Sequence, residues 1–495
     1  MIRPVLLLGA CLTLAVASAA EKVRAPVQTT ALASPAAAGA VGAALYATTG
    51  GTVWITWVEP GAAGANTLRF SVLDAAGMKW STARTIARGT NIGASAMDFP
   101  QLAADDAGHA TVVWTDGHGG ALLSQTSDHG DTWSTPAPVT RESTGVEKFS
   151  LTVLADNRVL VAWLDARGIA AGGKTTRLYA RIAGEPGPDV LVDPSVCDCC
   201  QTTLTPFLDG GALLAYRART EEEVRDIRTA RFRGKSWDEP RPLNHDDWRL
   251  NGCPVNGPRL ASDGGRVAAV WFTAADNDPR VLASFSPDAG TRFLMPLRVD
   301  LGHPTGHVET LLLRDGALLV TWLEADGSYW LRRVSPDFTA DEPIALAPAG
   351  AVAAKDFPRS ALLRNYAGAS GTAQFVAAYA RAGNPGELHT LLVTVREGEL
   401  LAAGKDCDCA PTPEQLAGFP MRGTVAAVSA DRGLVRAQHG EIPGIFAAGA
   451  HEFHAAPEVI ASVAQGRQFL GRIERRDGAW WVFDVRLLVQ PAGTP

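Results

Sequence analysis

The sequence predicts an all-β protein: a β-propeller of six or seven blades, followed by a second and smaller all-β domain. Three observations lead to this prediction. Short apolar strands that carry an aromatic residue near their end recur every 49 to 57 residues, Gly- and Asp-rich turns separate them, and helical periodicity is almost absent. Repeats of three or four strands at this period are typical of propeller blades.

The chain begins with a segment that has the features of an export signal. Arg3 supplies a positive charge, an apolar run extends from Val5 to Val16, and small residues offer a cleavage site near Ala19 or Ala20. The run is too short to span a membrane. We therefore expect residues 1–20 to be a signal peptide, and the mature chain to be periplasmic or secreted without a transmembrane segment. A lipoprotein is the less favoured alternative, because the apolar run continues past Cys11.

Composition and charge narrow the range of partners. The chain has 495 residues, of which 46% are hydrophobic and 20% charged, which is ordinary for a globular protein with a large core. The net charge of −7 is spread along the chain, and there is no basic stripe. Nucleic acid is therefore not an expected partner.

Residues 21–398 are expected to form the propeller. The seven aromatic anchors are Trp57, Trp114, Trp163, Tyr216, Trp271, Trp322 and Tyr379. Seven anchors favour seven blades, and six remains the alternative because one repeat could be incomplete. The segment Val23 to Thr30 is expected to supply the strand that closes the ring.

Two turns of the propeller resemble the Asp-box of sialidases. Residues 126–133 fit the pattern S/T-x-D-x-G-x-T-W/F completely, and residues 286–293 fit it except at Arg292. In such a turn the Asp accepts backbone N–H bonds, the Gly adopts a positive φ, and the aromatic residue packs between blades. The residues with this structural role are Asp128, Gly130, Trp133, Asp288, Gly290 and Phe293. The resemblance implies a sialidase-like propeller, in which these turns lie away from the active face. Further stretches resemble the exported bacterial type of this propeller; they are Cys197–Gln201, Tyr216–Arg217, Glu223–Ile227 and Asn251–Pro258.

The topology of a propeller gathers particular residues at one mouth of its central channel. Those that precede inner strands are Asp98, Glu147, Cys197 to Cys200, Asn251 to Cys253, His303, His307 and Asp356. Those that follow the anchors are Glu59, Asp116, Asp165, Arg217, Thr273, Glu324 and Arg381. We expect a ring of carboxylates, thiols, imidazoles and guanidinium groups there.

The cysteines are the most unusual residues of this set. The mature chain holds Cys197, Cys199, Cys200, Cys253, Cys407 and Cys409. One interpretation is that Cys199, Cys200 and Cys253, with His307, bind Cu(I) or zinc. The others are a disulfide, most simply between Cys200 and Cys253, and a catalytic thiol.

Sialidase chemistry is the enzyme alternative for the propeller. It requires three arginines for the substrate carboxylate, a Tyr–Glu nucleophile pair and an acid. The candidates are Arg217, Arg359, Arg381, Asp116, Asp165 and Glu223. The early Arg-Ile-Pro motif of that family is missing from residues 22–60, and Tyr216 is used as an anchor. No catalytic residue is therefore assigned, and surface ion pairing is the other interpretation of each candidate.

A different pattern begins after a cysteine-containing linker at residues 399–418. Residues 419–490 hold five short strands without a blade anchor, and His439, His451 and His454 lie among them. The order of strands and the segment from Gln438 to Gly444 resemble the small OB-type barrel of CusF-like periplasmic copper proteins. The resemblance implies a copper site at His439, with Gly449 and His451 where the family has Met, and His454 is an additional candidate. A barrel that kept its fold and lost its metal is the alternative.

These observations predict an exported copper-binding protein that acts in copper resistance, chaperoning or delivery. The propeller would be a docking module, for another periplasmic protein, or a second metal-binding module, with zinc as an alternative ion at the cysteines. An interaction scaffold held by structural disulfides and a sialidase-type glycoside hydrolase are the competing interpretations.

Overall fold

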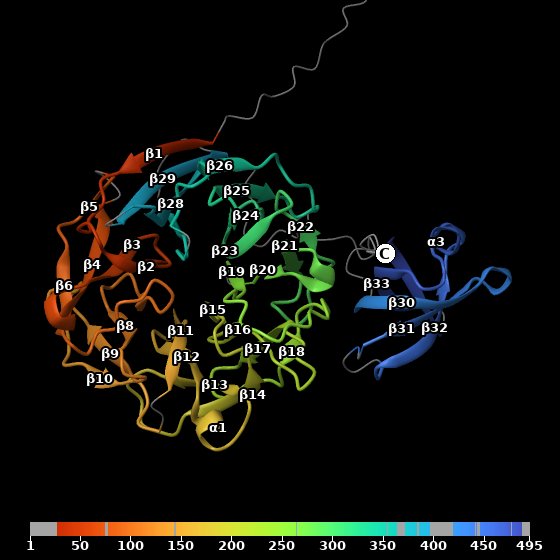
Figure 1. The fold of residues 1–495 in the computed structure, drawn as a ribbon, viewed down its shortest axis with the longest axis horizontal. Helices are drawn as coiled ribbons and strands as arrows, with labels where there is room; N and C mark the ends of the chain where they lie inside the picture. Colours follow the sequence, from red (N-terminus) through yellow and green to blue (C-terminus); the bar gives the residue numbers. More distant parts are fainter. Residues whose placement is uncertain are drawn as a thin grey trace, which may run out of the picture.

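The computed structural model describes residues 27–74, 78–142, 145–263, 265–353, 355–363, 372–383, 386–396, 419–440, 442, 446–476 and 478–487. Within these ranges the strands form seven sheets arranged in a ring, and one separate closed barrel (Figure 1). The all-β propeller and the barrel predicted from the sequence are therefore confirmed, with seven blades rather than six. The expected signal peptide and the linker cysteines Cys407 and Cys409 lie outside the described residues.

Each blade is an antiparallel sheet whose first strand lies innermost. The first four blades are β2 (Val41–Ala47), β3 (Val53–Glu59), β4 (Asn66–Asp74), β5 (Lys79–Trp80) and β6 (Arg84–Gly89); β7 (Gln101–Ala104), β8 (Ala110–Thr115), β9 (Ala121–Thr126) and β10 (Ala137–Pro138); β11 (Val146–Val153), β12 (Val159–Asp165), β13 (Thr176–Ile182) and β14 (Val190–Val196); and β15 (Thr203–Pro206), β16 (Ala212–Arg217), β17 (Ile227–Phe232) and β18 (Arg241–Pro242). A short helix, α1 (Arg167–Ala170), lies in the loop between β12 and β13.

The other three blades complete the circle. They are β19 (Arg259–Ser262), β20 (Val267–Thr273), β21 (Arg280–Ser286) and β22 (Leu297–Arg298); β23 (Pro304–Leu312), β24 (Leu318–Glu324), β25 (Tyr329–Val334) and β26 (Ile344–Ala347); and β27 (Arg359–Leu363), β28 (Thr372–Arg381), β29 (Glu387–Arg396) and β1 (Gln28–Leu32). The inner strands contact one another in the order β2, β7, β11, β15, β19, β23, β27 and back to β2. These contacts close the ring around a central channel.

The aromatic anchors lie in the second strand of each blade and are buried. Trp57, Trp163, Tyr216, Trp271 and Trp322 are 0% exposed. Each large ring removes apolar surface from water where two blades meet, which is the main stabilising contribution of such a side chain. The repeat therefore exists because every blade needs a large ring against its neighbour.

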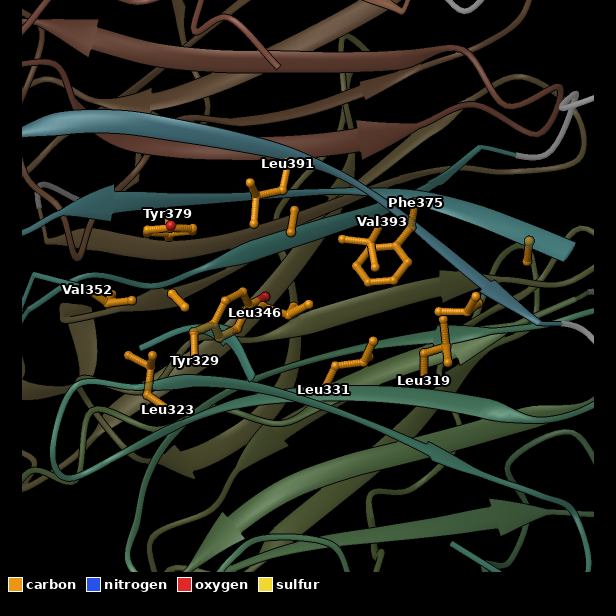
Figure 2. Packing of buried hydrophobic residues seen from close by; sticks show 14 of the residues in the cluster. Leu319, Leu323, Tyr329, Leu331, Leu346, Val352, Phe375, Tyr379, Leu391 and Val393 are labelled. Carbon is orange, nitrogen blue, oxygen red and sulfur yellow. The ribbon is translucent and has the colours of Figure 1, made fainter. Parts of the chain in front are cut away.

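The first and last segments of the propeller share one blade. β1 pairs antiparallel with β29, and the Thr390 hydroxyl donates a hydrogen bond to the carbonyl of Leu32 over 3.1 Å. The closing strand is thus Gln28–Leu32, slightly later than the predicted segment. Figure 2 shows the core beside this blade, with Phe375 and Tyr379 of β28 opposite Tyr329 of β25.

The two Asp-box turns have the geometry that their sequence predicts. In the first, Gly130 has a φ of 81°, and Asp128 accepts the Thr132 backbone N–H over 2.9 Å. In the second, Gly290 has a φ of 84°, and Phe293 is buried in the propeller core. Both turns are structural.

The C-terminal barrel closes in the strand order β30, β31, β32, β34, β33. Its elements are β30 (Phe419–Ser429), β31 (Leu434–His439), β32 (Gly449–Ala455), α3 (Pro457–Ser462), β33 (Gln468–Arg476) and β34 (Ala479–Leu487). Apolar residues such as Val425, Val435, Phe453 and Ile473 fill its interior. The described residues include no helix that is long and apolar enough to cross a membrane.

Candidate functional site

The residues that precede the inner strands meet around one mouth of the channel. Lys148 pairs with Asp98 of the preceding blade, and Asp98 and Asp198 both contribute to a raised pKa of Glu147, whose main cause is burial. Farther round the ring, Asn256 accepts the His307 backbone N–H over 2.8 Å. The structure therefore places groups from successive blades side by side.

The backbone has a positive φ at matching places on this mouth. Gly42, Lys148 and His307 have φ values of 64°, 53° and 50°, and each lies at a register shift near the start of its inner strand. Val255, before β19, has a φ of 51°. A residue other than Gly in this conformation costs about 1–3 kcal/mol, and such residues cluster at functional sites. Bulges of this kind redirect side chains, here at the channel mouth.

His307 lies near the start of the inner strand β23 and packs against its neighbours. The His307 ring stacks on Phe357 with centroids 4.2 Å apart, and its Nδ1 lies 2.6 Å from the Asp356 carbonyl oxygen. Burial lowers the pKa of His307 to about 4, so the ring is neutral at pH 7. Since its Nδ1 is engaged and its ring is stacked, His307 does not join the cysteine sulfurs as the sequence suggested.

The cysteines form a compact sulfur group beside this mouth. The Sγ atoms of Cys197, Cys199 and Cys200 lie within 4.8 Å of one another. Cys199 forms a disulfide with Cys253, whereas Cys197 and Cys200 are buried thiols with their sulfurs 2.8 Å apart. The expected pairing of Cys200 with Cys253 is therefore wrong; the first cysteine of the adjacent Cys199-Cys200 pair is the one that reaches Cys253.

The two thiols differ in acidity. The pKa of Cys197 is lowered to about 6, mainly by a hydrogen bond from Cys200. A backbone N–H bond and the charges of Arg217 and Arg225 lower it further. Burial and the neighbouring Cys197 raise the pKa of Cys200. Cys197 is thus the more acidic thiol of the pair, and thiolates are the forms that bind soft metals.

The arginines proposed for a sialidase site do not meet. Arg217 donates from three nitrogens to the carbonyls of Asn256, Arg225 and Phe272, at 2.6–2.8 Å. Arg359 is buried against Glu309, which also pairs with Arg259, and its guanidinium lies 3.8 Å from the Phe99 ring centroid. Arg381 is exposed and approaches His389. The arginine triad is therefore not formed, because two of the three are structural.

The proposed acids are also occupied by structural contacts. Asp116 accepts the backbone N–H groups of His118 and Gly120 in its own turn. Asp165 is fully buried and accepts the Trp163 indole N–H over 2.9 Å. Glu223 pairs with Arg219 and Arg225, which lowers its pKa. None of the three is positioned as a general acid.

Other carboxylates predicted for the mouth accept hydrogen bonds from the tryptophan anchors instead. Glu59 and Glu324 accept the indole N–H of Trp57 and Trp322 over 3.1 and 2.7 Å. The recurrent spacing of Trp, any residue and then Asp or Glu was visible in the sequence, and it signals this structural pairing. The polar residues Lys148, Arg259 and Glu309, which sequence reasoning missed, lie on inner strands where most positions are small or apolar.

In the barrel, two histidines face each other across adjacent strands. The Nε2 atom of His439, at the end of β31, lies 2.9 Å from the Nδ1 atom of His451 in β32. The other nitrogen of His439, Nδ1, lies 2.6 Å from the Gly440 carbonyl oxygen. A carbonyl can only accept, so His439 Nδ1 carries the proton and its Nε2 lone pair points toward His451.

An aromatic wall surrounds the histidine pair. The Phe446 ring centroid lies 4.5 Å from that of His451 and 5.2 Å from that of Trp480, and Phe453 packs against His439. Burial, and then the charge of His451, lower the pKa of His439. A Cβ atom at Gly449 would lie 3.4 Å from His451 Cε1, an ordinary van der Waals contact, so the imidazole does not require glycine there. An oriented imidazole pair of this kind can ligate a transition metal.

His454 does not belong to this pair. It lies in β32 beside the buried Phe453, so its side chain leaves from the opposite face of the strand. Its ring stacks on Trp481 with centroids 5.2 Å apart. The expectation that His454 is a further ligand is therefore wrong, because the twofold repeat of a strand separates it from His451.

The opposite half of the channel is hollow. A cavity of ≈ 640 Å³ is lined by the far ends of the inner strands and the turns that follow them, including Asp105, Asp106, Phe207 and Asp263. This space is large enough for a small ligand.

Comparison with known proteins adds information on the fold. No protein-family model and no curated protein matches the sequence. Among solved structures, the BP39L lectin from Burkholderia pseudomallei is similar, with a TM-score of 0.51 and 10% identity over 71% of this chain and 98% of the lectin. The polysaccharide lyase Uly1 has a TM-score of 0.42 and 10% identity over 72% and 90% of the two chains. The NanB sialidase from Streptococcus pneumoniae has a TM-score of 0.39 and 12% identity over 73% and 69%.

At 10% identity the lectin establishes the propeller architecture and nothing about ligands. The function therefore has to be argued from the side chains.

Proposed function

We propose that this chain is an exported protein that binds copper, and that the barrel histidines His439 and His451 are ligands. The observation that carries the proposal is the 2.9 Å approach of His439 Nε2 to His451 Nδ1. Two nitrogens at this separation can both reach one ion at the usual 2.0–2.1 Å distance of a metal–imidazole bond, once the proton that His451 Nδ1 donates to His439 Nε2 has moved to the other nitrogen of the His451 ring.

The chemistry of the ligands favours copper in its divalent state at this position. Imidazole suits Cu(II), and copper binds nitrogen ligands more tightly than the other divalent first-row metals do. The lowered pKa of His439 supports binding at neutral pH, because a proton does not have to be displaced from its metal-binding nitrogen. The hydrogen bond from His439 Nδ1 to Gly440 fixes the ring orientation before the ion arrives.

The test compares three forms of the mature chain, residues 21–495. Copper content after equilibration with one equivalent of Cu(II) and dialysis is measured by elemental analysis, together with nitrogen hyperfine coupling by electron paramagnetic resonance. The variant His439→Ala/His451→Ala should lose the nitrogen-coupled copper signal. His454→Ala is the matched control, since it removes an imidazole from the other face of β32 and should leave the signal unchanged. Equal copper and equal coupling in all three forms would contradict the proposal.

A second candidate, carbohydrate recognition by the propeller, is favoured by the fold-level likeness to a lectin and by the ≈ 640 Å³ channel cavity. Taken alone, the likeness of fold favours this candidate over copper binding. Of the residues considered for a sialidase-type site, however, Arg217 donates to backbone carbonyls, Arg359 pairs with Glu309, and Asp165 accepts the indole N–H of Trp163. Binding of the chain to an array of acidic and neutral glycans, unaffected by His439→Ala/His451→Ala, would support this second function.

A further inference from the structure

The cysteine sulfurs of the propeller form a cluster that is not part of the histidine site in the barrel. Cys197, Cys199 and Cys200 come from one loop before β15, and their sulfurs lie within 4.8 Å of one another. Cys253, from the loop before β19 in the next blade, is exposed and bonded to Cys199. One loop thus supplies three sulfurs, and the neighbouring blade supplies a fourth that can engage one of them.

Two buried guanidinium groups lie close to these sulfurs. Arg217 and Arg225 are each 1% exposed, and their charges act on Cys197. The guanidinium of Arg217 donates three hydrogen bonds to backbone carbonyls, and among the described residues it forms no ion pair. Arg225 pairs with Glu223 through one nitrogen, while its Nε and its Nη1 have no partner among the described residues.

Arg225 has Glu223 as a counter-charge, whereas Arg217 forms no ion pair among the described residues. A buried positive charge without a counter-charge is unfavourable, so Arg217 favours an anionic group in the space beside it. Three thiolates with one Cu(I) ion carry a net charge of −2, which the nearby charges of Arg217 and Arg225 would stabilise. Thiolates are also the ligands that Cu(I) prefers.

We propose that Cys197, Cys199 and Cys200 together bind one Cu(I) ion when Cys199 is reduced, and that the Cys199–Cys253 disulfide withdraws the third ligand and so weakens binding. This inference extends the proposed copper-binding function to a second, separate site and gives that site a redox control. Opening the disulfide takes two electrons and two protons from an external dithiol, which itself becomes a disulfide. The thiol protons are released when Cu(I) binds, and the copper does not change oxidation state.

The experiment uses the full mature chain in a background that lacks the other candidate ligands: His439→Ala, His451→Ala, Cys407→Ser and Cys409→Ser. Protein is reduced with a phosphine, desalted without oxygen, and titrated with the Cu(I)–bicinchoninate complex. We expect one Cu(I) per reduced chain and an apparent affinity on the order of 100-fold weaker for the disulfide form, about 2.7 kcal/mol.

Two variants separate the roles of the sulfurs. Cys253→Ser cannot form the disulfide, so it should bind Cu(I) equally well with and without prior reduction. Cys199→Ser should bind weakly in both conditions, and circular dichroism of each variant establishes that it is folded. Zinc binding that requires Cys253 would instead indicate a four-thiolate zinc site and overturn the proposal.

Equal Cu(I) affinity in the reduced and oxidised forms would also overturn it, as would a count of zero free thiols in the unreduced background chain. Failure here is distinguishable from failure of the barrel site, because the barrel histidines are absent from this background and are tested in a chain with intact cysteines.

Discussion

Replacing Arg217 with Met should destabilise the propeller because of the hydrogen bonds that its guanidinium makes. The change keeps most of the aliphatic volume but removes the donors to the carbonyls of Asn256, Arg225 and Phe272. Each carbonyl left buried without a partner costs about 1–3 kcal/mol, and relief of the buried charge offsets part of that sum. We expect a net loss of about 4 kcal/mol, which corresponds to a decrease in Tm of roughly 5 °C for a domain of this size.

Urea unfolding followed by tryptophan fluorescence measures this loss, because the tryptophan anchors are buried in the propeller. Arg381→Met is the matched control: it removes an exposed guanidinium and should change the free energy of unfolding by less than about 0.5 kcal/mol. If Arg217→Met unfolds within about 1 kcal/mol of the wild-type chain and abolishes binding of a carbohydrate, Arg217 is a ligand-binding residue and the structural assignment is wrong.

Three further changes test the fold and its electrostatics. Gly130→Ala should reduce the free energy of unfolding by about 2–4 kcal/mol, because φ is 81° and the new Cβ would lie 2.4 Å from Phe70 Cζ. In the same urea unfolding assay Gly265→Ala should be neutral, because its Cβ would meet no atom within 4 Å. Burial raises the pKa of Asp356 from 3.8 to about 6, so the folded state holds this proton more tightly than the unfolded chain does. The free energy of unfolding of the wild-type chain should therefore fall by about 3 kcal/mol as pH rises from about 4 to about 6. Asp356→Asn should remove that pH dependence, and an unchanged slope would show that another group titrates. Phe453→Ala, in the barrel core, should reduce the free energy of unfolding of the barrel by about 3–4 kcal/mol. Calorimetry should then show a lower transition temperature for the barrel and an unchanged one for the propeller; a shift of both temperatures would contradict independent unfolding.

The architecture was predictable because its signals are local and repeated. Each blade needs a large ring against the next one, so the anchors recur and their number gives the number of blades. The Asp-box turns were predictable for a similar reason, since Gly130 and Gly290 are required by a positive φ. The fifth strand of the first blade, β6, has no matching signal and was missed.

The site was predictable only in part, because side-chain partners depend on distances that a sequence does not contain. Propeller topology correctly gathered Asp98, Glu147 and His307 at one mouth. It could not show that the Asp165 carboxylate accepts a hydrogen bond from the Trp163 indole, nor that Cys253 forms its disulfide with Cys199 rather than Cys200. In the barrel, the alternation of side chains along β32 is enough to separate His454 from His451.

The pairing of β1 with β29 has a consequence for biosynthesis. Leu32 aligns with Thr390, so the two halves of the last blade are made at opposite ends of the propeller segment. Earlier blades can assemble as the polypeptide emerges, but the circle stays open until nearly all of that segment has been synthesised. The contact between these strands is among the most non-local in the chain, and such contacts slow folding. A chain truncated before residue 387 would lose β29 and also leave β1 without the strand it pairs with, so an incomplete product would expose two unfinished edges for aggregation or proteolysis.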